Sequence, residues 1–353
     1  MILYNKFKNK KILITGHTGF KGSWLAYCLF LFGAKVYGIS KNTLGDKSLY
    51  KILNLKKKIN SIFIDINNYE RFESAVIKIK PDIIFHLAAE SIVSRAYEFP
   101  LDTFKTNIIG TANLLNIIKK FRHHCACIFI TSDKCYENIE TKRSYVEKDR
   151  LGGSDPYSSS KACAEIIISS MYRSYLSNNT KVQIGVCRAG NVIGGGDWSV
   201  NRLIPDVVRS IESKDVIKIR NPQSTRPWQH VLDPLNGYII LAYKLYFKNF
   251  NSGLAFNFGP DPKNKHSVRF VLDTINRIHK INYKITKSNK IKEANLLSLN
   301  SRKARKLLSW NCKYNTKIAI KKTIDWYLTY LSFPNKIENF TRLQINDFFL
   351  INE

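Results

Sequence analysis

The stretch KILITGHTGFKGSWL, residues Lys11–Leu25, decides the fold. Its first five residues form a short apolar run that predicts a buried β-strand, and the apolar residues after the glycines predict a helix through about Phe32. Gly16, Gly19 and Gly22 are spaced as G-x-x-G-x-x-G between the two elements. Glycine permits a tight turn and lets backbone N–H groups approach a pyrophosphate at the helix N-terminus. The pattern therefore predicts a dinucleotide-binding turn.

Outward from this turn, strand-like and helix-like segments alternate. We expect strands at Lys35–Ile39, Ser61–Ile66, Asp82–Leu87, Ala126–Thr131 and Val182–Arg188, and helices at Tyr69–Lys80, Asp102–Lys120 and Pro156–Tyr175. Such alternation, with nearly continuous apolar strands, predicts an α/β fold with a Rossmann-type doubly wound parallel sheet. After Gly190 the chain turns to loops rich in Gly, Pro and Trp. We therefore expect a dinucleotide-binding domain over 1–189 and a smaller C-terminal substrate lobe over 190–353, with segment 230–259 returning to the first domain through a strand at Leu254–Gly259.

Composition narrows the class of protein. The 353 residues carry a net charge of +29, but the lysines are spread along the chain and no arginine-rich run is interleaved with aromatics. We therefore expect solvated lysine faces that attract an anionic substrate, and no nucleic-acid partner. Seven irregularly spaced cysteines predict neither a disulfide framework nor a metal site. The longest apolar run, Trp24 to Phe32, is far below the roughly 18 residues of a membrane span, so we expect a cytoplasmic protein without membrane contact.

A second motif, Y-x-x-x-K, places Tyr157 and Lys161 one helical turn apart. A nearby ammonium lowers the pKa of a phenol, so Tyr157 could act as a base near neutral pH. Lys161 could also hold the ribose of a nicotinamide. An exposed surface pair is the alternative interpretation, but the position of the motif in the alternating pattern favours catalysis.

A third motif, Ile130–Tyr136 (ITSDKCY), follows the expected fifth strand, at the edge where doubly wound sheets bind ligands. Ser132 would complete a Ser/Tyr/Lys set. Asp133 and Lys134 are the informative pair, because a dehydratase needs a proton donor for the departing hydroxyl and a base at the adjacent carbon. The alternative is a helix-capping Asp followed by an exposed Lys.

Together these residues resemble the extended short-chain dehydrogenase/reductase family. The glycine spacing, Asp65-Ile66 after the third strand, HLAAE at His86–Glu90, and Asn107 carry the resemblance. Further stretches resemble the CDP-glucose 4,6-dehydratases within that family: SDKCYEN (Ser132–Asn138), LGGSDPYSSSKACAE (Leu151–Glu165), RAGNVIGGGDW (Arg188–Trp198), RLIPD (Arg202–Asp206), RNPQSTRPWQHVLDPLNGY (Arg220–Tyr238) and FNFGP (Phe256–Pro260). These matches run from about Lys11 to Trp310.

The resemblance implies NAD as cofactor and CDP-glucose as substrate, converted to CDP-4-keto-6-deoxyglucose and water by a homodimer or dimer of dimers. The implied catalytic residues are Ser132, Asp133, Lys134, Tyr157 and Lys161. The implied cofactor contacts are Gly16, Thr18, Gly19, Phe20, Gly22, Asp65, Ile66, Leu87, Ala88, Ala89, Asn107, Tyr157 and Lys161. The implied substrate contacts are Glu90, Asn191, Arg202, Arg226 and His230, with Arg226 at the diphosphate and Asn191 at the nucleotide sugar.

Several alternatives remain open. Ser40 and Lys41 follow the second strand, where NAD enzymes commonly place an acid, so the residues leave NADP open as well. The substrate could carry dTDP or GDP, and a nucleotide-sugar epimerase shares the fold. A non-catalytic NAD- or nucleic-acid-binding protein is the alternative from another class.

Overall fold

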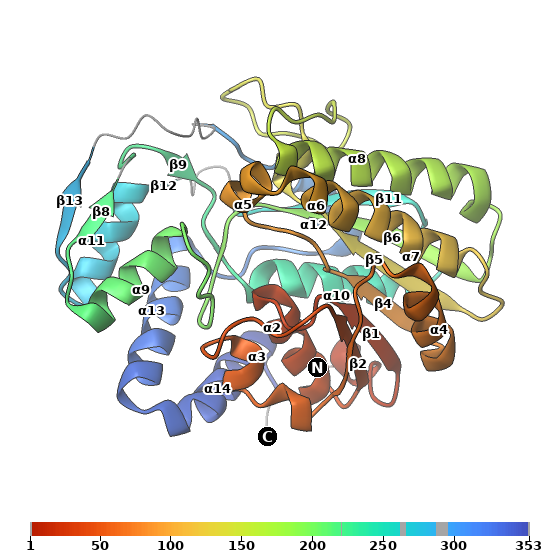
Figure 1. Cartoon of the computed structure of the whole chain (residues 1–353), viewed down its shortest axis with the longest axis horizontal. Coiled ribbons are helices and arrows are strands. Elements are labelled where there is room, and N and C mark those ends of the chain that lie inside the picture. The colour runs from red at the N-terminus through yellow and green to blue at the C-terminus, as the bar shows by residue number, and fades with distance from the viewer. Residues whose placement is uncertain (1, 220, 262–265, 287–295, 352–353) are drawn as a thin grey trace.

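A seven-stranded parallel sheet forms the centre of the protein (Figure 1). The structure is a computed structural model that describes residues 2–219, 221–261, 266–286 and 296–351, so Arg220 of the quoted motif lies outside the described residues. The strand order is β11-β6-β5-β4-β1-β2-β3. The strands are β1 (Lys11–Thr15), β2 (Lys35–Ser40), β3 (Asn60–Phe63), β4 (Ile83–His86), β5 (Cys125–Ile130), β6 (Val182–Ala189) and β11 (Leu254–Phe258). The predicted α/β fold with a doubly wound parallel sheet is confirmed.

The inner strands β1, β4 and β5 are mostly apolar and buried because both of their faces are covered, whereas the edge strand β3 is partly exposed. In β5, Ala126 and Ile128 belong to one core, while Cys127 and Phe129 belong to the other. This alternation follows from the two-residue period of a strand. Helices α2 (Phe20–Leu31) and α10 (Leu232–Phe247) supply the first core, and α4 (Tyr69–Ile79), α7 (Gly110–Ile118) and α8 (Pro156–Met171) supply the second. The two sets lie on opposite sides of the sheet (Figure 1).

The strand order reverses at β1, which pairs with β2 on one side and β4 on the other. In doubly wound sheets this switch point opens a crevice at the carboxyl ends of the strands. Because all neighbouring strands of the sheet are parallel, the residues after β1, β4, β5 and β6 meet at the same edge. The predicted motifs follow these four strands.

A second group of elements lies beside this edge, at the left of Figure 1. It contains α9 (Leu203–Ser213), α11 (Val268–Ile278), α13 (Thr316–Ser332) and the parallel pair β8 (Ile217–Ile219) and β13 (Tyr283–Ile285). Two short pairs connect it to the sheet: β7 (Val192–Ile193) with β10 (Gln229–His230), and β9 (Thr225–Arg226) with β12 (His266–Ser267). The remaining helices are α1 (Ile2–Asn5), α3 (Leu49–Ile52), α5 (Val93–Glu98), α6 (Pro100–Phe104), α12 (Arg302–Leu308) and α14 (Ile337–Phe349).

The C-terminal helix α14 packs against the N-terminal part of the chain. The Phe349 ring lies 4.8 Å from that of Tyr4 and 5.2 Å from that of Phe32, measured between centroids. Glu338 accepts a hydrogen bond from Lys58. One apolar core therefore continues from the sheet into the last helix, which the sequence pattern did not predict.

The helix expected at Asp102–Lys120 is divided into α6, a π-helical turn (Lys105–Ile109) and α7. Asn107 lies in the turn, and its side chain bonds the backbone N–H and carbonyl of Glu90 and the hydroxyl of Ser160. π-helical turns of this kind often occur at functional sites. The expected third strand is also shorter and ends at Phe63, so Asp65 and Ile66 lie in the turn beyond it.

Among the described residues, no helix is both long and apolar enough to cross a membrane, and no group of three or more His, Cys, Asp or Glu could hold a metal ion. All seven cysteines are free. Cys163 and Cys312 are partly exposed and the other five are buried.

Candidate active site

The glycine-rich turn packs directly against the segment that follows strand β4. Gly16 has a φ of +78°, and a Cβ there would lie 2.7 Å from the backbone nitrogen of Ala88. A Cβ on Gly22 would lie 2.1 Å from the Gly16 carbonyl oxygen. Gly19 begins helix α2 without a side-chain cap. The helix N-terminus therefore faces the cavity with unmet N–H groups and a positive dipole end, which is the arrangement that binds a pyrophosphate.

The turn lines one cavity of about 1630 Å³ at the carboxyl edge of the sheet. A single drug-sized ligand occupies roughly 300–1,000 Å³, so the cavity has room for two ligands. Every predicted cofactor residue except Asn107 lines it: Gly16, Thr18, Gly19, Phe20, Gly22, Asp65, Ile66, Leu87, Ala88, Ala89, Tyr157 and Lys161. Asn107 is buried behind the wall, and its bonds to Glu90 and Ser160 give it a positioning role.

Ser40 and Lys41, the two residues that left the cofactor open, both line this cavity but already have partners. The Ser40 hydroxyl bonds the Nδ1 of buried His17 at 2.9 Å, and burial lowers the pKa of that imidazole to about 4. Lys41 forms an ion pair of 3.1 Å with Asp65. The carboxylate at this end of the cavity thus comes from the turn after β3, and no acid follows β2 directly.

Helix α8 brings Tyr157 and Lys161 to the cavity wall. Asp155 caps the helix by accepting hydrogen bonds from the backbone N–H of Ser158 at 2.9 Å and from its hydroxyl at 2.5 Å. Pro156 occupies the first turn, where its missing N–H costs nothing. Capping fixes the start of the helix, so both side chains emerge on the same face toward the sheet edge.

Ser132 lies near enough to Tyr157 to act on its pKa, which joins the second and third sequence motifs. Burial raises the pKa of Tyr157 to about 12, with Ser132 and the charge of Arg202 acting against it. The expectation that Lys161 lowers the pKa of this phenol is wrong for the protein alone. Burial also lowers the pKa of the Lys161 ammonium, to about 8, so burial outweighs the charge on which the expectation rested.

Asp133 is buried in a short 3₁₀ turn (Asp133–Cys135) directly after β5. Its Oδ1 accepts a hydrogen bond of 3.0 Å from the Ser132 hydroxyl. Burial raises its pKa, while the charges of Lys134, Lys21 and Arg226 oppose the rise. A raised pKa favours the protonated carboxyl group, which is the form that can donate a proton.

Gly190, at the end of β6, faces the same carboxyl group. A Cβ on Gly190 would lie 2.7 Å from the Oδ2 of Asp133. Any larger residue would displace the carboxyl group from the sheet edge. Lys134 is partly buried and lines the cavity beside Asp133.

A buried ion pair supports this turn from behind. Arg188 donates to both carboxylate oxygens of Glu165, at 2.8 and 2.7 Å, and to the Tyr136 hydroxyl at 2.8 Å. Thr131 donates to the same carboxylate at 2.5 Å. The network ties β5, β6 and α8 together on either side of Asp133. Sequence reasoning missed it because the partners are 23 residues apart and lie on different elements, so no local spacing joins them.

The predicted substrate residues fall into two groups. Glu90, Asn191, Arg202 and Arg226 line the cavity on the side of α9 and β9 or at its rim. His230 is fully buried and does not line it; its Nδ1 accepts a hydrogen bond from the backbone of Leu232. The assignment of His230 as a substrate contact is therefore corrected to a core position.

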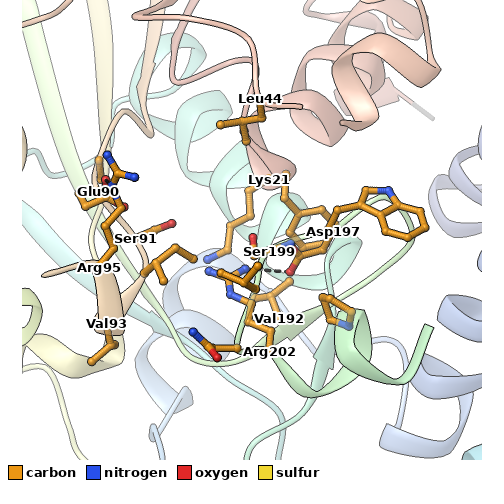
Figure 2. Close-up of a pocket in the computed structure, with 18 of the residues that line it drawn as sticks. Lys21, Leu44, Glu90, Ser91, Val93, Arg95, Val192, Asp197, Ser199 and Arg202 are labelled. Atoms are coloured by element: carbon orange, nitrogen blue, oxygen red, sulfur yellow. Dashed lines mark hydrogen bonds and ion pairs between the residues drawn. The ribbon is translucent and has the colours of Figure 1, made fainter. Parts of the chain in front are cut away.

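Asp197 and Lys21 are charged residues of the cavity that were not predicted. Asp197 is buried and accepts a hydrogen bond of 2.8 Å from Arg202, which is drawn in Figure 2. Lys21 projects from the glycine-rich turn into the same space. The sequence does contain a signal for each: a charged residue stands inside GGGDW and inside GFKG. A small or apolar residue would serve a turn equally well at either place.

The doubly wound sheet, the glycine turn and the Ser132, Tyr157 and Lys161 set define a Rossmann-type enzyme of the short-chain dehydrogenase/reductase class. The chain belongs to the family described as GDP-mannose 4,6 dehydratase, whose model matches residues 13–323.

Individual relatives agree with this family. A CDP-glucose 4,6-dehydratase from Salmonella typhimurium is 39% identical over 337 residues, covering 94% of each chain. A dTDP-glucose 4,6-dehydratase from Bacillus anthracis, solved in complex with NAD, superimposes with a TM-score of 0.77 at 23% identity, covering 91% of this chain and 97% of its own. A UDP-glucuronic acid 4-epimerase from Bacillus cereus, with TM-score 0.77 and 19% identity, covers 90% and 99%.

Proposed function

We propose that the protein is an NAD-dependent CDP-glucose 4,6-dehydratase, which converts CDP-glucose to CDP-4-keto-6-deoxyglucose and water. The one observation that carries the proposal is buried Asp133 with a raised pKa, hydrogen-bonded to Ser132 beside Tyr157. An epimerase needs no acid at this place, whereas elimination of a hydroxyl does. The CDP-glucose dehydratase of Salmonella typhimurium, 39% identical along nearly the whole chain, supports the choice of base and sugar.

The residues of the glycine-rich turn fit a dinucleotide. Backbone approach is possible only because Gly16 and Gly22 lack a Cβ, and the uncapped start of α2 would hold the cofactor's diphosphate. Lys161 would hold the nicotinamide ribose, and Asp65 lies at the adenosine end. When bound, NAD would accept the hydride from C4 of the sugar and return it to C6 at the end of the reaction.

Ser132 and Tyr157 would act on the C4 hydroxyl. Ser132 is placed to orient that hydroxyl because it lies beside Tyr157 and its hydroxyl is held by Asp133. Tyr157 would take the hydroxyl proton as the C4 hydride leaves. Its pKa of about 12 in the protein alone would have to fall, and a cationic ligand beside the phenol would lower it. Oxidation at C4 makes the hydrogen at C5 acidic.

Asp133 and Lys134 would then complete the elimination. Asp133 donates its proton to the C6 hydroxyl, so that water leaves and the C5–C6 double bond forms. Lys134 lines the cavity next to that carboxyl group and is the candidate either to remove the C5 proton or to stabilise the enolate by its charge. Arg226 and Asn191 would bind the diphosphate and the nucleotide sugar from the opposite wall.

A panel of nucleotide sugars tests the proposal directly. Purified protein with NAD is incubated separately with CDP-, dTDP-, GDP- and UDP-glucose, and the 4-keto-6-deoxy product is followed by its absorbance in alkali and by mass. We expect loss of water from CDP-glucose well ahead of the others. Turnover of another nucleotide would correct the base, and a 4-epimer of unchanged mass would overturn the dehydratase assignment in favour of an epimerase.

A homodimer, or a dimer of dimers, is part of the same proposal. Tyr97, Leu101, Ile109 and Ile166 are each more than half exposed or close to it, and they lie on α5, α6, the π-helical turn and α8. Both α5 and α6 contact α8, so these elements form one apolar surface suited to a two-fold interface. Leu101→Glu, at the most exposed of the four, should convert the dimer to a monomer in sedimentation velocity.

Two further proposals concern the roles of the two parts of the chain and the compartment in which the protein works. We propose a division of labour in which residues 1–189 with the return segment bind the cofactor and the rest of 190–353 binds the nucleotide sugar. We also propose that the protein works in the cytoplasm, where seven unpaired cysteines remain reduced.

A further inference from the structure

Lys21 is a charged side chain inside the cavity that the proposed reaction does not yet use. It belongs to the first turn of α2, between Phe20 and Gly22 of the glycine-rich turn. Its side chain runs from that turn toward Arg202 and Ser199 on the opposite wall (Figure 2). It is partly buried, and among the described residues its ammonium makes no hydrogen bond or ion pair. A cation held in this way is available to a ligand.

The charges around Lys21 place it at one end of the cavity. It interacts electrostatically with Asp133, Asp197 and Arg202, and it acts in turn on the ammonium of Lys161. Asp133 marks the reacting end of the sugar, and Lys161 marks the nicotinamide ribose. Lys21 therefore lies near the site of hydride transfer.

The Lys21 side chain is a cation under ordinary conditions. Burial and, to a smaller extent, the charge of Arg202 lower its pKa to about 8, against the attraction of Asp133 and Asp197. At pH 7 a group with that pKa is roughly nine-tenths protonated. Two ammonium groups, Lys21 and Lys161, thus share one end of a partly desolvated cavity, where charges interact more strongly than in water.

We propose that Lys21 tunes the bound cofactor, because its ammonium repels the cationic nicotinamide ring of NAD and leaves the neutral ring of NADH unaffected. The proposal rests on the proposed function. In the first half-reaction the sugar alcohol is oxidised: its C4 hydride, with two electrons, moves to the ring, and its hydroxyl proton moves to Tyr157. The ring loses its positive charge in that step. A cation beside the ring therefore favours oxidation of the sugar.

Binding measurements separate this role from a simple contact with phosphate. Dissociation constants for NAD, NADH and ADP-ribose are measured by calorimetry for the wild type, Lys21→Met and Lys21→Arg. ADP-ribose carries the diphosphate but no nicotinamide. In Lys21→Met, the ratio of the NAD constant to the NADH constant should fall by about tenfold, as expected for removal of one nearby charge. Lys21→Arg should keep the ratio, and ADP-ribose affinity should change less than about threefold in both variants.

Lys47→Met is the matched control. Lys47 also lines the cavity, but it is exposed and paired with Glu212, so its loss should leave the ratio unchanged. An unchanged ratio in Lys21→Met, or equal weakening of all three ligands, would overturn the proposal and place Lys21 on the diphosphate or in a structural role. Wild-type protein that binds neither dinucleotide would instead refute the proposed function, and this inference with it.

Discussion

Replacing Asp133 by Asn removes the proposed proton donor with minimal change in shape. The Oδ1 that accepts the Ser132 hydroxyl at 3.0 Å is kept, so the turn after β5 and the set of Ser132, Tyr157 and Lys161 should remain in place. Oxidation at C4 should therefore survive. Elimination should stop, because an amide cannot give a proton to the C6 hydroxyl.

The structure sets the size of the effect near the upper end for a lost general acid. Such losses cost about 10²–10⁴-fold. Asp133 is 4% exposed, and its Oδ2 faces Gly190 so closely that a single added carbon would lie 2.7 Å away. Among the described residues, no other acidic side chain is held at this position, so we expect a fall of roughly 10³–10⁴-fold in product formation, or about 4–5.5 kcal/mol in activation free energy.

The assay follows two signals in one sample of Asp133→Asn with NAD and CDP-glucose. Reduced nicotinamide should accumulate on the enzyme, while the 4-keto-6-deoxy product should not. In the wild type, product formation should fall as the pH rises through the raised pKa of Asp133, because the proton donor is then lost. Asp46→Asn, a fully exposed carboxylate at the rim of the same cavity, should behave as wild type. Normal dehydration by Asp133→Asn would refute the reasoning.

Further substitutions test other parts of the structure. Tyr157→Phe should bind cofactor but lose about 10²–10⁴-fold in turnover; near wild-type rates would remove the phenol from the mechanism. Lys134→Ala should slow exchange of the C5 hydrogen with solvent, measured by mass, whereas unchanged exchange would assign Lys134 no part in the elimination. Arg188→Met should lower the free energy of unfolding by about 3–5 kcal/mol, because Glu165 would be left buried and unpaired; urea unfolding measures this, and a loss below about 1 kcal/mol would contradict it. Burial raises the pKa of Asp233 to about 7, so this carboxyl group ionises in the unfolded chain first, and stability should fall between about pH 4 and pH 7. Asp233→Asn should flatten that fall in urea unfolding, and an unaltered slope would show that the group does not titrate there.

The proposed dimer interface and the cavity are formed by different residues, so oligomeric state and cofactor binding can be tested independently. Leu101 is exposed on α6 and does not line the cavity. A monomeric Leu101→Glu protein that still binds NAD would show that the cofactor site is complete within one chain.

Much of the fold was predictable because its signals are local. The inner strands between Lys11 and Ala189 are marked by apolar runs, since both of their faces are covered. The turn at Gly16 and the start of α8 at Asp155 were likewise predictable, because a positive φ and a helix cap depend on residues a few positions apart. The sequence by itself thus determined the sheet, the glycine turn, and the end of β5 where Ser132 and Asp133 stand.

Other features depend on contacts between segments that are distant in the sequence, and only the tertiary structure decided these. The break of the long helix at Asn107 arises because its side chain is held by the loop at Glu90 and by Ser160 of α8. Helix α14 packs beside Tyr4 from the other end of the chain, and the pKa of Tyr157 is raised by burial that no i, i+4 spacing could reveal. Lys21 acquires its neighbours only where the turn after β1 faces the segment around Arg202. Local spacing fixes which side chains share an element, but burial and charge at a site are set by every element that packs around it.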